Sequence, residues 1–116
     1  MSRHEPQVSL RHMLDHADEC VRMMEDVRRE DLLQDRKLFL AVVRLLEIVG
    51  EAANRIPRDH RDRIADIPWQ QIIRMRNHLS HAYENINFHI VWDTVHDDLP
   101  PLIRTLRALL GEGQEP

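Results

Sequence analysis

Apolar residues in this chain recur at intervals of three and four positions, the spacing that places side chains along one face of an α-helix. No segment shows the strict alternation of apolar and polar residues that is typical of a half-buried β-strand. Four helical runs can be traced along the chain. We therefore expect an all-α fold, an antiparallel bundle of four helices around one hydrophobic core.

The first two runs predict the helices of the N-terminal half. The first helix is expected from Leu10 to near Val27, with Ser9 or the residues just before it as the N-cap. Residues 28–31 are charged and predict a connector. Residues 38–56 keep a heptad rhythm and predict the longest helix.

Small residues in the second helix indicate a close neighbour. Gly50, Ala52 and Ala53 lie within it, although glycine in a helix interior costs about 1 kcal/mol relative to alanine. The close approach of another backbone best explains this glycine. Two neighbours are open at this point: the helix that carries residues 76–81, or the same helix of a second protomer.

The C-terminal half predicts a short charged element and two longer helices. Pro57 ends the second helix, and residues 58–63 are expected to form a short turn or helix. Pro68 suits the first position of the third helix, and Asn87 is the expected N-cap of a fourth helix that reaches Leu110. The positions expected to face the core are Trp69, Ile72, Ile73 and Leu79 in the third helix and Phe88, Trp92, Val95, Leu99, Leu102, Leu106 and Leu109 in the fourth.

Two consecutive prolines interrupt the fourth helix. Pro100 and Pro101 lack the backbone N–H, and their rings clash with the carbonyls four residues earlier. We therefore expect the last helix to be kinked or broken there. The expected organisation is one domain over residues 8–110, with flexible tails at residues 1–7 and 111–116.

Charge narrows the possible partners. The chain has 116 residues, 16 of them basic and 20 acidic, and its formal charge of -4 argues against a general nucleic-acid binder. Residues 55–83, however, contain six arginines and three aspartates. This local excess predicts either a patch that attracts RNA phosphates or a solvated loop held by salt bridges, and the sequence leaves both open.

Cysteine and histidine usage adds two expectations. The chain has one cysteine, no secretory signal and no apolar run of membrane-spanning length, so we expect a cytoplasmic protein without a membrane partner. Cys20 is expected to be a buried, inert thiol. His12 and His16 have the spacing of a helical zinc pair, but no third or fourth ligand can be identified.

The richest concentration of functional groups is at residues 76–83, Arg-Asn-His-Leu-Ser-His-Ala-Tyr. On a helix, Asn77 and His81 share a face, whereas Arg76 lies about 140° from His81. Two arrangements would bring the guanidinium and the imidazole together. Either the stem of Arg76 wraps around the helix, or the helix ends near Ser80 and the chain turns the imidazole back.

These residue types suit phosphate chemistry. His81 can transfer protons near neutral pH, and Arg76 can hold two phosphate oxygens. Asn77 can fix the tautomer of His81 or hold a phosphate oxygen, and Tyr83 can donate to a phosphate or stack on a base. His78 would either join this cluster or lie at an exposed or interface position. The structural alternative is that the same side chains satisfy carbonyls and the dipole at a helix end.

Two carboxylates of the second helix are candidates for a supporting role. Glu47 and Glu51 lie one helical step apart, and they form either a solvated stripe or partners for Arg76 or His81. Paired acids are missing near the motif itself. We therefore expect no nuclease metal site and no cofactor.

The order of these motifs resembles one family. Arg76, Asn77, His81 and Tyr83 match the R-N-x-x-x-H-x-Y form of an R-x4-6-H motif. The likeness continues through residues 47–53, 67–69, 91–92 and 98–100. Over residues 8–110 the chain resembles HEPN domains of the HepT type, which implies a four-helix HEPN-type bundle with a short extra helix.

The resemblance also implies a function. In HepT-like proteins, the residues that Arg76 and His81 match cleave RNA without a metal ion at a homodimer interface. The implied system is a type VII HEPN/MNT toxin-antitoxin pair, in which a minimal nucleotidyltransferase (MNT) antitoxin adenylylates the residue that Tyr83 matches. The RNA substrate stays open, with tRNA and mRNA both compatible.

Two other functions remain as alternatives. One is a non-catalytic helical subunit that binds a nucleotide or tRNA for a minimal nucleotidyltransferase. The other is a metal-binding helical bundle that uses His12 and His16.

Overall fold

The computed structural model describes residues 5–81 and 85–111, and this part of the chain is helical without a strand. The elements are α1 (Pro6–Met23), α2 (Arg29–Gln34), α3 (Arg36–Arg55), α4 (Arg58–Asp62), α5 (Trp69–His81), α6 (Phe88–Asp93), a π-helical turn (Thr94–Asp98) and α7 (Leu99–Leu109). The all-α prediction is confirmed. None of the described helices has the length and apolar character needed to cross a membrane.

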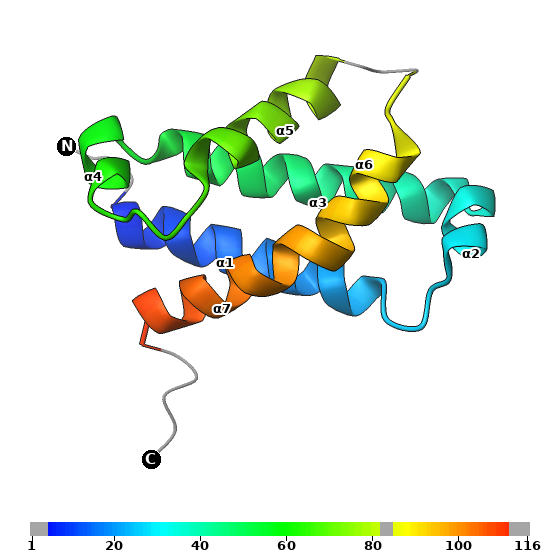
Figure 1. The fold of residues 1–116 in the computed structure, drawn as a ribbon, viewed down its shortest axis with the longest axis horizontal. Coiled ribbons are helices and arrows are strands. Elements are labelled where there is room, and N and C mark those ends of the chain that lie inside the picture. Colours follow the sequence, from blue (N-terminus) through cyan, green and yellow to red (C-terminus); the bar gives the residue numbers. More distant parts are fainter. Residues whose placement is uncertain (1–4, 82–84, 112–116) are drawn as a thin grey trace.

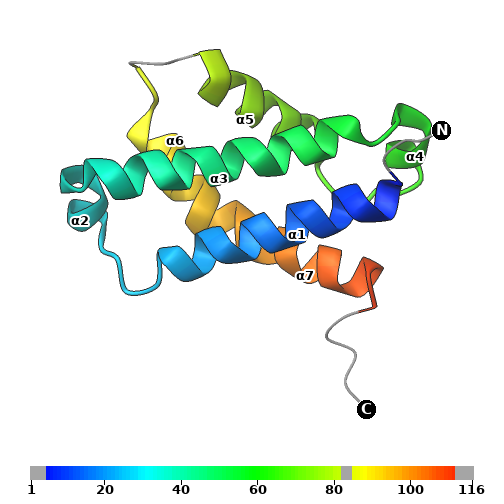
Figure 2. The ribbon, with the colours of Figure 1, turned by 180° about the vertical axis from the view of Figure 1, so that it is seen from behind.

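The four long segments pack as an antiparallel bundle. Helices α1 and α3 lie side by side in opposite directions, α5 packs on α3, and α7 packs along α1. Figure 1 shows that α6, the π-helical turn and α7 form one long diagonal across the bundle. From the opposite side, α1 and α3 form the face of the molecule, with α5 above α3 and α7 below α1 (Figure 2).

The buried side chains confirm the helical periodicity. The core contains Leu10, Leu14 and Ala17 of α1, Val42, Leu45, Val49 and Ala52 of α3, Leu79 of α5, and Val91, Val95, Leu99, Leu102 and Leu106 of the last segment. Cys20 is fully buried, as expected for a structural thiol. Burial, and to a lesser degree the charge of Glu19, raises the pKa of Cys20 to about 12, so this thiol stays protonated and unreactive.

The first helix differs from the prediction at its N-terminus. It begins at Pro6 rather than Leu10, and Ser9 is buried within its first turns instead of capping it. Proline is well suited to this first position because its φ is already helical and it has no N–H to satisfy. Pro6 and Gln7, which were expected in a tail, are therefore helical.

The segment after α1 contains a helix that the sequence did not predict. Residues 28–31 were expected to form a connector, but α2 begins at Arg29. The carboxylate of Asp31 accepts a hydrogen bond from the backbone N–H of Arg28 at 3.0 Å. Leu32, only 1% exposed, anchors the helix. One buried leucine is too little to give a periodic signal.

The fourth predicted helix has its expected start and an unexpected interior. The side chain of Asn87 accepts hydrogen bonds from the backbone N–H groups of His89 and Ile90 at 2.9 and 3.2 Å, which confirms the N-cap. The break takes the form of the π-helical turn, directly before Pro100 and Pro101 at the start of α7. This turn accommodates prolines that a regular α-helix would exclude.

The π-helical turn also contacts the N-terminal half of α5. Asp98 accepts a hydrogen bond from the side-chain amide of Gln71 at 3.2 Å. Burial, followed by the neighbouring charges of Asp97 and Asp93, raises the pKa of the Asp98 carboxyl. The contact links the start of α5 to the last segment of the bundle.

Gly50 is the position where α3 and α5 come closest. A Cβ placed on it would lie 2.2 Å from Cβ and 2.8 Å from Cγ of Arg76, and 3.3 Å from the carbonyl oxygen of Ile72. Of the two neighbours that the sequence left open, the structure therefore shows the helix that carries residues 76–81. Glycine is required here because the stem of Arg76 occupies the space that a side chain would need.

We predict that Gly50→Ala destabilises the fold, although alanine is the better helix former. Overpacking of this size typically costs about 1–3 kcal/mol, which exceeds the gain of about 1 kcal/mol in helix propensity. Urea unfolding followed by circular dichroism measures the change. In an Arg76→Gly background, which removes both close atoms, the same substitution should cost much less. A stabilised Gly50→Ala protein would show that the two helices are not in close contact.

Candidate active site

Residues 76–81 of the motif lie on the last two turns of α5, which packs on α3. Leu79 faces the core and is 3% exposed, which fixes the rotation of this end of the helix. His81 is still helical and is the last residue of α5 in the described range, so the chain does not turn back before the imidazole. Of the two arrangements left open by the sequence, the described residues agree with the one in which Arg76 reaches around the helix, and its guanidinium extends as far as Asn77.

Asn77 contacts both functional groups of the motif. Its side-chain oxygen accepts a hydrogen bond from a terminal nitrogen of Arg76 at 3.0 Å. Its backbone oxygen lies 2.8 Å from Nδ1 of His81. Asn77 and His81 are exposed and Arg76 is half-buried, so one surface presents the guanidinium, the amide and the imidazole together.

The contact of His81 determines which ring nitrogen is available. A carbonyl oxygen only accepts hydrogen bonds, so Nδ1 of His81 must carry the proton in this arrangement. In neutral His81 the other nitrogen, Nε2, is then the unprotonated one. An exposed Nε2 on a neutral imidazole can accept a proton from a substrate near neutral pH.

The stem of Arg76 is held more tightly than its terminal nitrogens. Its Nε is buried and has no hydrogen-bond partner among the described residues, and its Cβ and Cγ lie against Gly50. Leaving a buried donor unpaired costs about 1–3 kcal/mol. The unpaired Nε belongs to Arg76, the residue whose guanidinium bonds to Asn77.

The carboxylates of Glu47 and Glu51 in α3 contact residues other than Arg76 and His81. Glu47 accepts a hydrogen bond from the hydroxyl of Ser80 at 3.2 Å, and its second oxygen is 3.5 Å from Arg44. Glu51 lies 3.3 Å from the same arginine. In the described ranges neither carboxylate bonds to Arg76 or His81. Arg44 was not among the residues expected to contact these acids, although its spacing of three and seven residues from them was a usable signal.

His78 and Tyr83 are the two remaining candidate residues of the motif. His78 is half-buried, and its Nε2 is buried without a partner among residues 5–81 and 85–111. It lines an apolar hollow with Gln71, Met75 and Ile90, away from the contacts of Asn77. Tyr83 lies outside the described residues, so its expected role stays a prediction.

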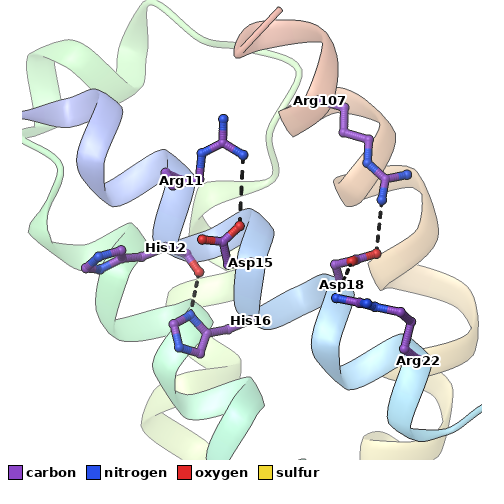
Figure 3. A network of polar contacts seen from close by, with 7 residues as sticks. All are labelled: Arg11, His12, Asp15, His16, Asp18, Arg22 and Arg107. Carbon is purple, nitrogen blue, oxygen red and sulfur yellow. Dashed lines mark hydrogen bonds and ion pairs between the residues drawn. The ribbon is translucent and has the colours of Figure 1, made fainter. Parts of the chain in front are cut away.

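The two histidines of α1, His12 and His16, contact each other. Nδ1 of His16 bonds to the backbone oxygen of His12 at 2.7 Å, and the two rings meet edge to face with centroids 6.1 Å apart (Figure 3). Within the described ranges, no three or more acidic, histidine or cysteine side chains form a group that could hold a metal ion. The structure therefore gives no support to a metal-binding function for His12 and His16.

The fold and the motif define a class of protein, and the comparison with known families agrees. The sequence model of the family described as "Ribonuclease HepT-like" matches residues 13–109. This chain belongs to that family, and its bundle is of the HEPN type.

Two relatives show how far the similarity extends. The chain is 40% identical over 93 residues to a Thermococcus cleftensis protein named "Probable ribonuclease HepT", covering 77% of this chain and 84% of the relative. It is 32% identical over 105 residues to a Caldanaerobacter subterraneus subsp. tengcongensis protein named "Putative RNase TTE0752", covering 90% and 94%. No solved structure gives a significant match to the chain.

Proposed function

We propose that this protein is a metal-independent endoribonuclease, the toxin of a type VII HEPN/MNT toxin-antitoxin pair. The observation that carries the proposal is that Asn77 contacts both Arg76 and His81. Membership of the ribonuclease HepT-like family supports it. RNA is the substrate, and the reaction uses the chemistry of the RNA itself.

RNA carries its own nucleophile in the 2′-hydroxyl group. The 2′-oxygen attacks the adjacent phosphorus and loses its proton to a base, while the bond to the 5′-oxygen breaks and that oxygen gains a proton. The products are a 2′,3′-cyclic phosphate and a 5′-hydroxyl end. His81 accepts or donates one of these protons at Nε2, and Arg76 stabilises charge on the phosphate oxygens. Asn77 holds both groups in place.

One protomer provides one arginine and one histidine, whereas in-line displacement benefits from groups on both sides of the phosphorus. A two-fold homodimer would supply the second pair. Gly50 is covered by Arg76 of the same chain, so we place the interface on exposed residues near Asn77 and His81 and not on the small residues of α3. Sedimentation at micromolar concentration should show a dimer, and a stable monomer there would rule out the composite site.

We predict that Arg76→Ala and His81→Ala each lower the rate of RNA cleavage by about 100-fold or more, as loss of a positioned catalytic group does. Cleavage of single-stranded RNA in excess chelator, with analysis of the product ends, measures this. His96→Ala is the matched control, because His96 is also exposed and bonds through Nδ1 to a backbone oxygen, that of Trp92, at 2.9 Å. It should cleave normally.

Two results would contradict the cleavage proposal. Activity that disappears with chelator and returns with magnesium would refute metal independence. No cleavage by the wild-type protein would favour the non-catalytic subunit that binds a nucleotide or tRNA. An equal loss of activity in the His96→Ala control would show that the loss in His81→Ala is not specific to the candidate site.

We further propose that a minimal nucleotidyltransferase antitoxin neutralises the toxin by adenylylating Tyr83. This tyrosine follows His81 by two residues. An added AMP group would bring negative charge and bulk close to the imidazole, where an RNA phosphate must bind. The same charge would compete with RNA for Arg76.

Tyr83→Phe should keep ribonuclease activity and escape the antitoxin, because it retains the ring and lacks the acceptor oxygen. Intact mass after coexpression with a cognate nucleotidyltransferase is the measurement. The wild-type chain should gain the mass of one or more AMP units and the variant none. Equal modification of both chains would place the acceptor on another residue.

A further inference from the structure

A second group of arginines lies at the opposite end of α5 from His81. Arg58 and Arg61 of α4 and Arg74 of α5 line an open hollow together with Trp69. The remaining lining residues are Asp62, Pro68, Gln70 and Gln71. Three guanidinium groups and one carboxylate thus share this surface of a chain whose formal charge is -4.

These arginines differ from several others in the described part of the chain, because they form no ion pair there. Within the described ranges, no ion pair joins an arginine of residues 55–81 to an acid, whereas Arg22, Arg44 and Arg107 each have a carboxylate within 3.5 Å. Figure 3 shows Asp18 between Arg22 and Arg107. Of the two interpretations of the basic segment, the solvated loop held by salt bridges therefore has no support here.

Local hydrogen bonds hold the hollow in shape. Nε of Arg61 donates to the backbone oxygen of Ile56 at 2.9 Å, which fixes its stem. The indole N–H of Trp69 donates to the backbone oxygen of Ile64, also at 2.9 Å. Arg58 and Arg74 are exposed. Trp69 packs partly against the core and also lines the hollow, so a held aromatic side chain lies beside exposed guanidinium groups. This combination suits an unpaired base and its phosphates.

One exposed stripe of α5 connects this hollow to the candidate active site. Gln70, Arg74, Asn77 and His81 are all exposed, and their spacing places them within about 60° of one another around the helix. The stripe is about 16 Å long, at about 1.5 Å per residue. A strand that enters the site at His81 can therefore follow α5 to Arg74 and the hollow.

We infer that the hollow between α4 and α5 is a binding subsite for single-stranded RNA that flanks the cleaved phosphate. Arg58 and Arg74 contact backbone phosphates, and Trp69 stacks on an unpaired base. This inference rests on the proposed function, because it assigns the strand to the same RNA that His81 and Arg76 cleave. It also identifies the substrate as single-stranded over the nucleotides next to the cleavage point.

Binding and cleavage are measured separately in the test. All binding is measured in the His81→Ala protein, with a fluorescent single-stranded RNA of about ten nucleotides and with the corresponding duplex. Adding Arg58→Ala or Arg74→Ala should weaken binding and lower the slope of log affinity against log salt by about 0.7 for each lost phosphate contact. Arg104→Ala, an exposed arginine of α7, is the control and should leave both values unchanged.

The test distinguishes a failure of the proposed subsite from a failure of the proposed RNA cleavage. Loss of binding in the Arg58 and Arg74 variants supports the subsite even if the wild-type protein does not cleave the RNA. Unchanged affinity and salt slope in both variants would overturn the subsite while leaving cleavage by Arg76 and His81 intact. Tighter binding of the duplex than of the single strand would overturn the single-strand assignment.

Discussion

The contact between Gly50 and Arg76 is the constraint on which the candidate site depends. On an isolated helix, Arg76 would point about 140° away from His81. Because α3 offers no side chain at residue 50, the stem of Arg76 passes between the two helices and its terminal nitrogen reaches Asn77. The backbone oxygen of Asn77 also bonds to Nδ1 of His81. A core packing contact thus sets the geometry of surface groups.

Charge is distributed unevenly over the molecule, and this bears on its function. Acidic side chains pair with arginines on α1, α3 and α7, as between Asp18 and Arg107 at 3.0 Å. The surface of α4 and α5 has no such pairs among the described residues, so its arginines keep their positive potential. An acidic protein can in this way attract a polyanion at one surface while the rest of it remains unattractive to nucleic acids.

The sequence predicted the parts of the fold that depend on repeated burial. The four main helical segments follow from apolar periodicity, and the N-cap at Asn87 follows from a local hydrogen bond that any helix start requires. The parts missed depend on tertiary contacts that leave no periodic signal. Helix α2 is held by the buried Leu32 and by Arg29, which lies over the rings of Phe88 and Trp92. The prolines predicted an interruption of the last helix, but not that it would be a π-helical turn.

The candidate site was predictable to a similar extent. The shared face of Asn77 and His81 follows from helical geometry alone, and the wrapping of Arg76 was one of two arrangements that the spacing allowed. Choosing between them required the position of α3. The pairing of Glu47 and Glu51 with Arg44 was predictable from helical spacing, because all three residues lie on one helix.

If residue 50 controls RNA cleavage through Arg76, the cleavage rate of Gly50→Ala must fall. The rate is measured at a temperature where circular dichroism shows the variant to be folded. Gly50→Ala should cleave RNA far more slowly than the wild-type chain, because the added Cβ displaces the stem of Arg76. It should have no further effect in an Arg76→Gly background, which lacks both of the close atoms. A folded Gly50→Ala protein with the wild-type rate, or an equal loss in both backgrounds, would contradict the account.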